Sequence, residues 1–375
     1  MTGDADSAPP FTPFMAGLPA EVPFVPMEAL QRARGGRPFR ARIGANESRF
    51  PPSPRVVEAL KSAAGEARLY GDPEFWDLRS ALAARFGVRP RQVSVGEGID
   101  GLLGHVLRLF VGQGDRVVLP QGSYPTMGYH IRGHGGEAVH VPYLQDRVDP
   151  QAMSAAARRT GAKILYLANP DNPMGGWITG AEIQAMTEAL PPDCVLVLDE
   201  AYAEFAPPEA LPPLDVSRTN LLRLRTFSKA YGLAGMRVGY VLAHEAICAG
   251  FDRIRNHFGV NRLGQIAALA ALEDEAHLQA TIAASVAARE ELTRIARANG
   301  LTPLPSATNF VTMDCGRDGV YAKRVLEELA ARDLFIRKPG APGLDRCIRV
   351  SAGAPAEMAL FAEALPEALK AAAQD

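Results

Sequence analysis

Between residues 92 and 242, short apolar runs alternate with longer segments, most of which are helical in pattern. The runs are Gln92–Val95, Arg116–Leu119, Ala138–Val141, Lys163–Leu167, Cys194–Leu198, Leu221–Leu224 and Val238–Leu242. Strands that alternate with helices predict a mostly parallel sheet whose two faces are both covered. We therefore expect an α/β fold with helices on both sides of the sheet. Ligands of such sheets bind at the carboxyl ends of the strands.

The pattern changes after about residue 262. An alanine-rich helical stretch comes first, and the expected elements that follow it are a strand over Thr308–Met313, a helix over Val320–Ala331 and a strand over Cys347–Val350. This order predicts a second, smaller α+β domain, completed by the proline-rich N-terminal arm. The expected division is an arm of residues 1–48, a large domain of residues 49–262 and a small domain of residues 263–375.

Several helix boundaries are marked by capping residues. The dipeptides Ser53-Pro54 and Asp72-Pro73 each predict a helix that starts at the proline, and Gly87 would end the second. Thr179–Glu182 has the pattern of a capping box and predicts a further helix start.

Composition and charge exclude several classes of partner. The formal net charge of the 375 residues is -2, and the Lys and Arg residues form no basic run, so nucleic acid is not expected to bind. No apolar run approaches the roughly 20 residues of a membrane span, and the N-terminus lacks a signal-peptide pattern. We expect a cytoplasmic protein that does not bind membranes.

No metal site is expected either. The four cysteines lie far apart, without Cys-x-x-Cys spacing. His130 and His134 have the spacing of two ligands on one helix, but three nearby glycines disfavour a helix there, and no third ligand is evident.

A lysine lies in a glycine-rich turn between two of the expected strands. Lys229 belongs to the segment Thr226–Tyr240, with the sequence TFSKAYGLAGMRVGY. An ammonium held between buried strands loses hydration, so the pKa of this lysine should fall, and a lysine of lowered pKa is a Schiff-base nucleophile. The hydroxyl of Ser228 and the guanidinium of Arg237 are suited to hold a phosphate near it.

Other polar residues follow the ends of expected strands. Asp199 ends a buried strand, where an isolated aspartate more often caps the next turn. The segment Gly96–Gly101 fits both a phosphate-binding helix start and a Gly-x-Gly-x-x-Gly dinucleotide loop. A dinucleotide site would also need an acidic residue about 20 positions later, at the end of the second strand. Asp115 comes too early for that role.

In this order, the motifs resemble those of the fold-type-I pyridoxal-phosphate aminotransferases of class I and II, and are closest to the histidinol-phosphate aminotransferase branch. The resemblance covers residues from about 44 to 353. It implies that Lys229 forms the Schiff base with the cofactor and moves the Cα proton, and that Asp199 pairs with the pyridine nitrogen. It also implies that Tyr202 and Asn172, from the turn Asn169–Gly175, contact the phenolate oxygen of the ring.

Further roles are implied by the same resemblance. The cofactor phosphate would be held by Gly98, Ile99, Asp100, Thr226, Ser228 and Arg237. Tyr124 would stack on the pyridine ring, although core packing explains this residue equally well. Tyr70 would reach the phosphate from a partner subunit, which implies a homodimer with shared active sites. Met174 replaces the usual threonine of its turn, a change that would affect only the pocket wall.

The substrate is less closely defined. By resemblance, Arg349 would bind the α-carboxylate of the amino acid, and Arg337 and Asn46 would also contact substrate. Phe24 stands near the place where histidinol-phosphate enzymes carry a phosphate-binding tyrosine, but it has no hydroxyl and would instead line an apolar pocket for the substrate side chain. Both a histidinol-phosphate-like and an aromatic amino acid therefore remain candidate donors, with a 2-oxo acid such as 2-oxoglutarate as the acceptor. A lyase like threonine-phosphate decarboxylase is the main alternative, and an NAD-dependent oxidoreductase is a more distant one.

Overall fold

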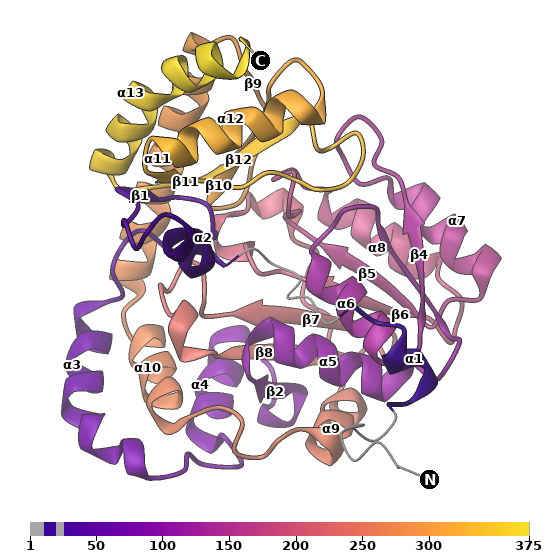
Figure 1. Cartoon of the computed structure of the whole chain (residues 1–375). Helices are drawn as coiled ribbons and strands as arrows, with labels where there is room; N and C mark the ends of the chain where they lie inside the picture. Colours follow the sequence, from indigo (N-terminus) through magenta and orange to yellow (C-terminus); the bar gives the residue numbers. More distant parts are fainter. Residues whose placement is uncertain (1–10, 20–25, 375) are drawn as a thin grey trace, which may run out of the picture.

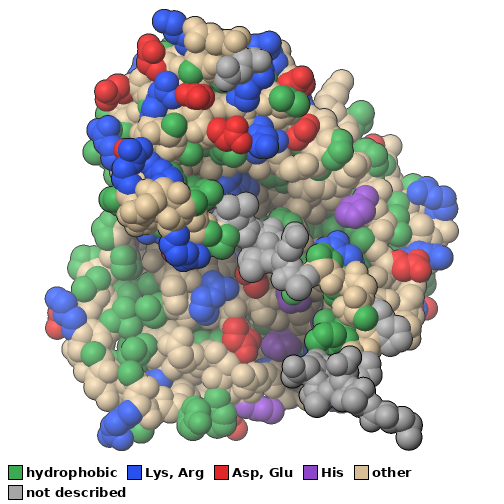
Figure 2. Space-filling model, in the orientation of Figure 1, with side chains coloured by type: hydrophobic (Ala, Val, Ile, Leu, Met, Phe, Trp, Pro, Cys, Tyr) green, Lys and Arg blue, Asp and Glu red, His purple; other side chains and the backbone are tan. Residues whose placement is uncertain are grey.

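The computed structural model describes residues 11–19 and 26–374. A seven-stranded sheet with its helices forms the larger part, and a smaller part with α11, α12 and α13 lies above it in the view of Figure 1. The surface is hollowed between the two parts (Figure 2).

The large sheet is parallel except for one strand. Its order is β2 (Val93–Gly96), β8 (Gly239–Ala243), β7 (Leu221–Thr226), β6 (Val195–Asp199), β5 (Ile164–Ala168), β3 (Arg116–Pro120) and β4 (Glu137–Val141). Only β8 runs antiparallel to its neighbours. All seven strands predicted from the sequence are present, and the mostly parallel sheet is confirmed.

Helices cover both faces of this sheet, because alternate residues along each strand point to opposite sides. Val195 and Val197 face one core and Leu196 and Leu198 the other. One face is covered by α5 (Gly98–Phe110), α6 (Pro125–Gly133) and α9 (Glu245–Ile254). The opposite face is covered by α7 (Pro150–Thr160), α8 (Gly180–Glu188), α4 (Trp76–Phe86) and α10 (Arg262–Leu272), with α3 (Pro54–Ala63) against α10.

The smaller part combines a short antiparallel sheet with three helices. The sheet has the order β12 (Cys347–Ser351), β10 (Phe310–Asp314) and β9 (Thr302–Pro303), and the helices are α11 (Glu275–Ala298), α12 (Gly319–Ala331) and α13 (Pro355–Ala372). Near the N-terminus lie α1 (Pro13–Ala16) and α2 (Met27–Ala33). After them, β1 (Ala41–Arg42) pairs with β11 (Leu334–Phe335), and Ile43 enters the core of the smaller part. The N-terminal segment therefore packs with residues nearly 300 positions away.

Two predicted helix boundaries differ from the structure. The helix expected from Pro73 begins at Trp76, because the Asp72 carboxylate accepts hydrogen bonds from the backbone of Glu74 and Trp76 and so forms a turn first. The alanine-rich stretch after residue 262 is two helices, and the second begins where Asp274 caps it by accepting from the His277 backbone. The boundaries at Ser53-Pro54, Gly87 and Thr179–Glu182 agree with the sequence analysis.

Helix α13 is missing from the sequence analysis although its pattern was available. Pro355 occupies its first turn, and Met358, Phe361, Leu365 and Ala368 are buried at helical spacing. None of the helices within the described ranges combines the length and hydropathy needed to cross a bilayer.

Candidate active site

A cavity of about 940 Å³ lies at the carboxyl ends of the parallel strands, between the large sheet and the smaller part. The predicted site residues that line it are Asn46, Ile99, Asp100, Tyr124, Asn172, Asp199, Tyr202, Thr226, Ser228, Lys229, Arg237, Arg337 and Arg349. We call the residues contributed from the large sheet and its loops, from Ile99 to Arg237, the cavity floor. The outer wall is formed by residues 45–47, 337–341 and 349.

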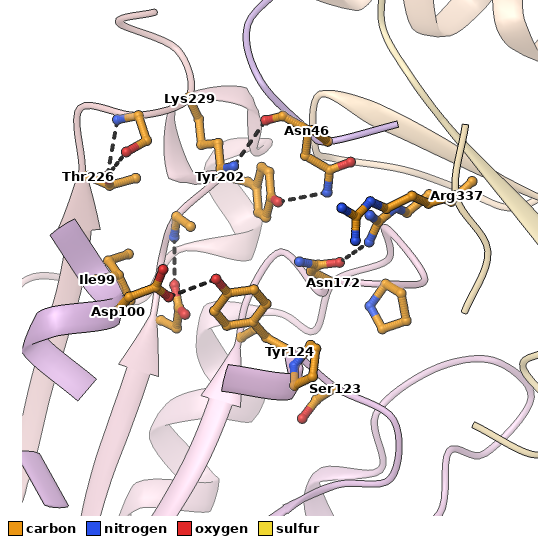
Figure 3. A pocket seen from close by; sticks show the side chains of 18 of the residues that line it. Asn46, Ile99, Asp100, Ser123, Tyr124, Asn172, Tyr202, Thr226, Lys229 and Arg337 are labelled. Atoms are coloured by element: carbon orange, nitrogen blue, oxygen red, sulfur yellow. Dashed lines mark hydrogen bonds between the residues drawn. The ribbon is translucent and has the colours of Figure 1, made fainter. Parts of the chain in front are cut away.

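Lys229 projects from a turn whose neighbours are anchored in the core. Phe227, Ala230 and Tyr231 are buried, whereas the lysine side chain enters the cavity. Its Nζ donates to the backbone carbonyl of Asn46 at 3.0 Å (Figure 3). Burial, and then the positive charge of Arg349, lower the pKa of Lys229 to about 8. The predicted fall in the pKa is thus present, and the amine is partly neutral near physiological pH.

Asp199 lies on the cavity floor at the end of β6. One carboxylate oxygen accepts from the hydroxyl of Tyr166 at 2.8 Å and the other from the backbone N–H of Ala201 at 3.0 Å. Burial raises the pKa of Asp199 to about 6, and the two hydrogen bonds act against this rise. Tyr166 is absent from the sequence prediction. Its signal was a hydroxyl in an otherwise apolar buried strand, which requires a polar partner.

An anion site forms where α5, β8 and the lysine turn meet. Gly98 has a φ of 74°, and a Cβ there would lie 2.7 Å from a guanidinium nitrogen of Arg237. A Cβ on Gly239 would lie 2.9 Å from the Gly98 carbonyl carbon, so only glycines permit this approach. The α5 N-terminus, Arg237 and the linked hydroxyls of Thr226 and Ser228 (3.0 Å) together favour a phosphate.

Tyr124 connects this anion site to the rest of the floor. Its hydroxyl donates to the Asp100 carboxylate at 2.7 Å (Figure 3), and burial raises its pKa. The ring also packs against the core that contains Ile99 and Leu102. The position therefore serves core packing and lines the cavity at the same time.

The outer wall is cationic. Arg349 donates to the Asn172 side-chain oxygen at 2.6 Å, and burial lowers the pKa of Arg349 to about 10. Arg337 lies beside it, since the backbone N–H of Arg349 donates to the Arg337 carbonyl at 2.7 Å. Two neighbouring guanidinium groups at a partly buried cavity favour a substrate with anionic groups.

Asn46 joins the wall to the floor. Its φ is 55°, a conformation that asparagine tolerates better than most residues, and its backbone N–H donates to the Ser351 hydroxyl. Its side-chain amide donates to the Tyr202 hydroxyl at 3.1 Å, while its carbonyl accepts from Lys229 (Figure 3). Burial raises the pKa of Tyr202 to about 12, so its hydroxyl stays protonated.

Two other described residues singled out from the sequence, Tyr70 and Met174, lie outside the cavity lining. Tyr70 is 78% exposed on the outside of the molecule, with its ring 4.8 Å from that of Phe258. Phe24 lies outside the described residues. Met174 is buried against Leu344 and Cys347, behind the cavity wall. Glu47 and Lys338 line the cavity but were not predicted, because nothing in their local sequence marks them.

The described side chains include no group of three or more His, Cys, Asp or Glu residues placed to share a metal ion. The residues present fit pyridoxal phosphate: a glycine-lined anion site, a lysine of lowered pKa and a buried carboxylate surround one cavity.

Comparison with known proteins agrees with a pyridoxal-phosphate site. The sequence profile of aminotransferase class I and II matches residues 42–365. A solved structure of histidinol-phosphate aminotransferase from Sinorhizobium meliloti, in complex with pyridoxal-5'-phosphate, is 49% identical, with a TM-score of 0.95. It covers 98% of this chain and 99% of its own. The histidinol-phosphate aminotransferase of Moorella thermoacetica is 34% identical over 93% of this chain and 90% of its own length.

A more distant solved structure is L-threonine-O-3-phosphate decarboxylase from Porphyromonas gingivalis. It is 25% identical, with a TM-score of 0.75, over 88% of this chain and 99% of its own. The profile match spans both the large sheet and the smaller part. The chain therefore belongs to the class I and II aminotransferases and has their fold.

Proposed function

We propose that this aminotransferase uses pyridoxal 5'-phosphate to move an amino group from a histidinol-phosphate-like or aromatic amino acid to a 2-oxo acid such as 2-oxoglutarate. One observation carries the proposal: a lysine with a pKa of about 8 lies in the same cavity as a glycine-lined anion site and a buried carboxylate. The family membership and the cofactor in the Sinorhizobium meliloti structure support the choice of cofactor.

When bound, the cofactor supplies an aldehyde that condenses with amines and a ring that accepts the electron pair released at Cα. We assign the phosphate to the anion site, namely Gly98, Ile99, Asp100, Thr226, Ser228 and Arg237. Asp199 would face the ring nitrogen, and Tyr124 would stack on the ring. Asn172 and Tyr202 would donate to its phenolate oxygen.

In this proposal Lys229 is both the covalent attachment point and the proton carrier. Its lowered pKa leaves part of the amine neutral near physiological pH, which is the form that attacks an aldehyde and accepts the Cα proton. The Asn46 carbonyl orients its Nζ. Arg349 would hold the α-carboxylate of 2-oxoglutarate and of amino-acid donors through paired N–H donors, so that the Cα–H bond of such a donor points toward the lysine.

The second arginine bears on the choice of substrate. Arg337 extends the positive charge of the wall beyond Arg349, which suits a phosphate or carboxylate on the substrate side chain. This charge favours histidinol phosphate as the donor and 2-oxoglutarate as the acceptor over an aromatic amino acid and an aromatic 2-oxo acid. The names of the relatives support the same donor. Asn46 and Phe24 are proposed to complete the substrate pocket.

The experiment is a half-reaction screen. The purified, cofactor-loaded protein is mixed with histidinol phosphate, phenylalanine, tyrosine, glutamate and O-phosphothreonine, and the visible absorption of the cofactor is followed. Rapid loss of the visible band with histidinol phosphate, and its return with 2-oxoglutarate, is the expected result. Release of carbon dioxide from O-phosphothreonine would instead establish the decarboxylase alternative.

A dinucleotide-dependent oxidoreductase gains no support from the site. The loop at Gly98 faces Arg237, the lysine turn and the hydroxyls of Thr226 and Ser228, an arrangement that fits a single phosphate group. Binding of NAD without any cofactor attachment at Lys229 would overturn the proposal.

We also propose a homodimer with shared active sites. Exposed apolar side chains lie on or near α3, α4 and α10: Val57, Leu69, Tyr70, Trp76 and Phe258. Figure 2 shows hydrophobic side chains gathered at the lower left, where these helices lie. Such a patch favours a protein interface, and Tyr70 within it would reach the partner's phosphate site.

Sedimentation equilibrium should give twice the chain mass, and Tyr70→Phe should weaken cofactor retention. A monomer of full activity would contradict the proposed homodimer.

The domain organisation and the location are proposals of the same kind. An arm of residues 1–48 would join a small domain of residues 263–375, supported by the pairing of β1 with β11. Residues 49–262 would form the cofactor-binding domain. Helix α10 follows this boundary in sequence but packs against α3 and α4 of the larger domain, so it would link the two. Action in the cytoplasm stays a prediction from the sequence.

A further inference from the structure

A tyrosine hydroxyl lies in the cavity floor, against the carboxylate of Asp199. Tyr166 is on β5, and Ala168, two residues later, is the register partner of Asp199 on β6. Residues two apart share a face of a sheet, so Tyr166 and Asp199 point to the same side from neighbouring strands. The Tyr166 hydroxyl donates to the Asp199 Oδ2 atom at 2.8 Å.

This contact is buried at the base of the cavity. Tyr166 has no exposed surface and Asp199 is 4% exposed. The tyrosine ring packs in the core under α5 and α6, where a phenylalanine would fill the same space. Burying a hydroxyl and a carboxylate is costly unless they bond to each other, so the packing of the core does not explain why the hydroxyl is there.

The hydrogen bond has a defined direction. Burial and the neighbouring carboxylate keep the pKa of Tyr166 well above its usual range, so the phenol donates its proton without losing it. A donor to the carboxylate stabilises the ionised form of Asp199, against the burial that favours the neutral form. Together with the Ala201 N–H on Oδ1, the phenol fixes both oxygens and thereby the orientation of the carboxylate.

We propose that Tyr166 is a positioning residue that acts through Asp199: it keeps this carboxylate ionised and turned toward the cavity, so that a proton shared between Asp199 and the cofactor ring nitrogen stays on the nitrogen. Without the phenol the carboxylate becomes more basic, and the shared proton shifts toward Asp199. A ring nitrogen that loses the proton is a weaker electron sink, so removal of the Cα proton slows. The inference rests on the proposed cofactor role of Asp199.

The test compares Tyr166→Phe with a matched control, Tyr143→Phe. Tyr143, which is half-buried, also donates from its phenol to a buried carboxylate, Asp171, at 2.9 Å, but this pair does not include Asp199. Each protein is loaded with pyridoxal phosphate carrying nitrogen-15 in the ring. The measurements are the ring-nitrogen chemical shift and the rate of the half-reaction with the best amino donor.

The expected result is specific to position 166. In Tyr166→Phe the nitrogen-15 shift moves toward that of an unprotonated pyridine, and the half-reaction slows by roughly 10- to 100-fold, as for the loss of one hydrogen bond to a charged group. In Tyr143→Phe the shift stays at the wild-type value. A wild-type shift in Tyr166→Phe would overturn the inference, even if that variant melts at a lower temperature.

A second substitution tests the direction. Placing 3-fluorotyrosine at position 166 makes the phenol a stronger donor and leaves the packing intact, so the nitrogen-15 shift should move toward the protonated form or stay there. A shift toward unprotonated pyridine would contradict the inference. The wild-type protein separates failure of this inference from failure of the proposed function. If the proposed function is wrong, borohydride reduction of the wild type leaves no cofactor attached to Lys229.

Discussion

The cavity floor and the outer wall are built in different ways. Floor residues come from the ends of adjacent strands and from the turns that follow them. Several bond to each other, as Tyr166 does with Asp199 on the next strand and Thr226 with Ser228 in the turn after β7. Wall residues come from the two ends of the chain. Asn46 and Arg349 reach the floor through Tyr202, Lys229 and Asn172, which lie more than 100 positions away in sequence.

This difference suggests a division of roles. The floor carries the proposed chemistry that any amino acid would undergo, and its geometry is fixed by a rigid sheet. The wall carries the positive charges that would select a substrate, and its geometry depends on how the smaller part packs on the larger one. Substitutions on the floor should therefore slow every substrate alike, whereas those in the wall should act on binding and selectivity.

Lys229→Ala is expected to have the largest effect. Removal of the nucleophile and proton carrier should reduce turnover by at least about 10,000-fold with every donor, because no other floor residue can replace both roles. The fold should persist, as Phe227 and Tyr231 anchor the turn in the core. Steady-state rates and circular dichroism measure the two effects. Near-normal turnover in Lys229→Ala would show that the reaction does not depend on this floor residue.

Asp199→Ala should come next. Loss of the carboxylate should slow Cα proton removal by about 100- to 10,000-fold while some cofactor is retained through the anion site. Single-turnover rates with a Cα-deuterated donor measure this step, and a kinetic isotope effect should appear or increase. If the rate is unchanged, Asp199 has no role at the ring nitrogen.

Arg349→Lys should act on the wall. A lysine keeps the charge but loses the paired donors, so kcat/KM should fall by roughly 10- to 100-fold for all α-carboxylate substrates. A donor without an α-carboxylate, such as histidinol phosphate, should be affected less. Arg346→Lys is the control, since Arg346 pairs with Asp146 and Asp314 and does not line the cavity. Equal losses in both variants would indicate general destabilisation.

The smallest expected effect is that of the Arg349 charge, in the wall, on the pKa of Lys229, in the floor. In the cofactor-free protein, the rate at which Lys229 reacts with an aldehyde should rise with pH and level off above about 8, because the neutral amine is the nucleophile. The charge of Arg349 contributes to the lowered pKa, so Arg349→Met should move this midpoint upward. Covalent labelling followed over a range of pH measures both. An unmoved midpoint would mean that the charge of Arg349 does not act on the pKa of Lys229.

Local sequence patterns were enough to predict most of the floor. Short apolar runs separated by helices led to the parallel sheet, and motifs directly after those runs placed Asp199, Asn172 and Lys229 at its carboxyl edge. This worked because strand ends of a parallel sheet must meet at one edge, whatever the details of packing. The sequence pattern of α13, with Pro355 in its first turn, would also have predicted that helix.

Only the tertiary structure brought Asn46 to Lys229, set Arg337 beside Arg349, added Lys338 to the wall and paired Tyr166 with Asp199. It also placed Tyr70 on the outside of its own chain and Met174 behind the cavity wall. These arrangements depend on strand register and on the packing of the two parts, which bring together side chains far apart in sequence. Local patterns report which face or strand end a residue occupies, but a contact across such a distance is fixed only by the packed core.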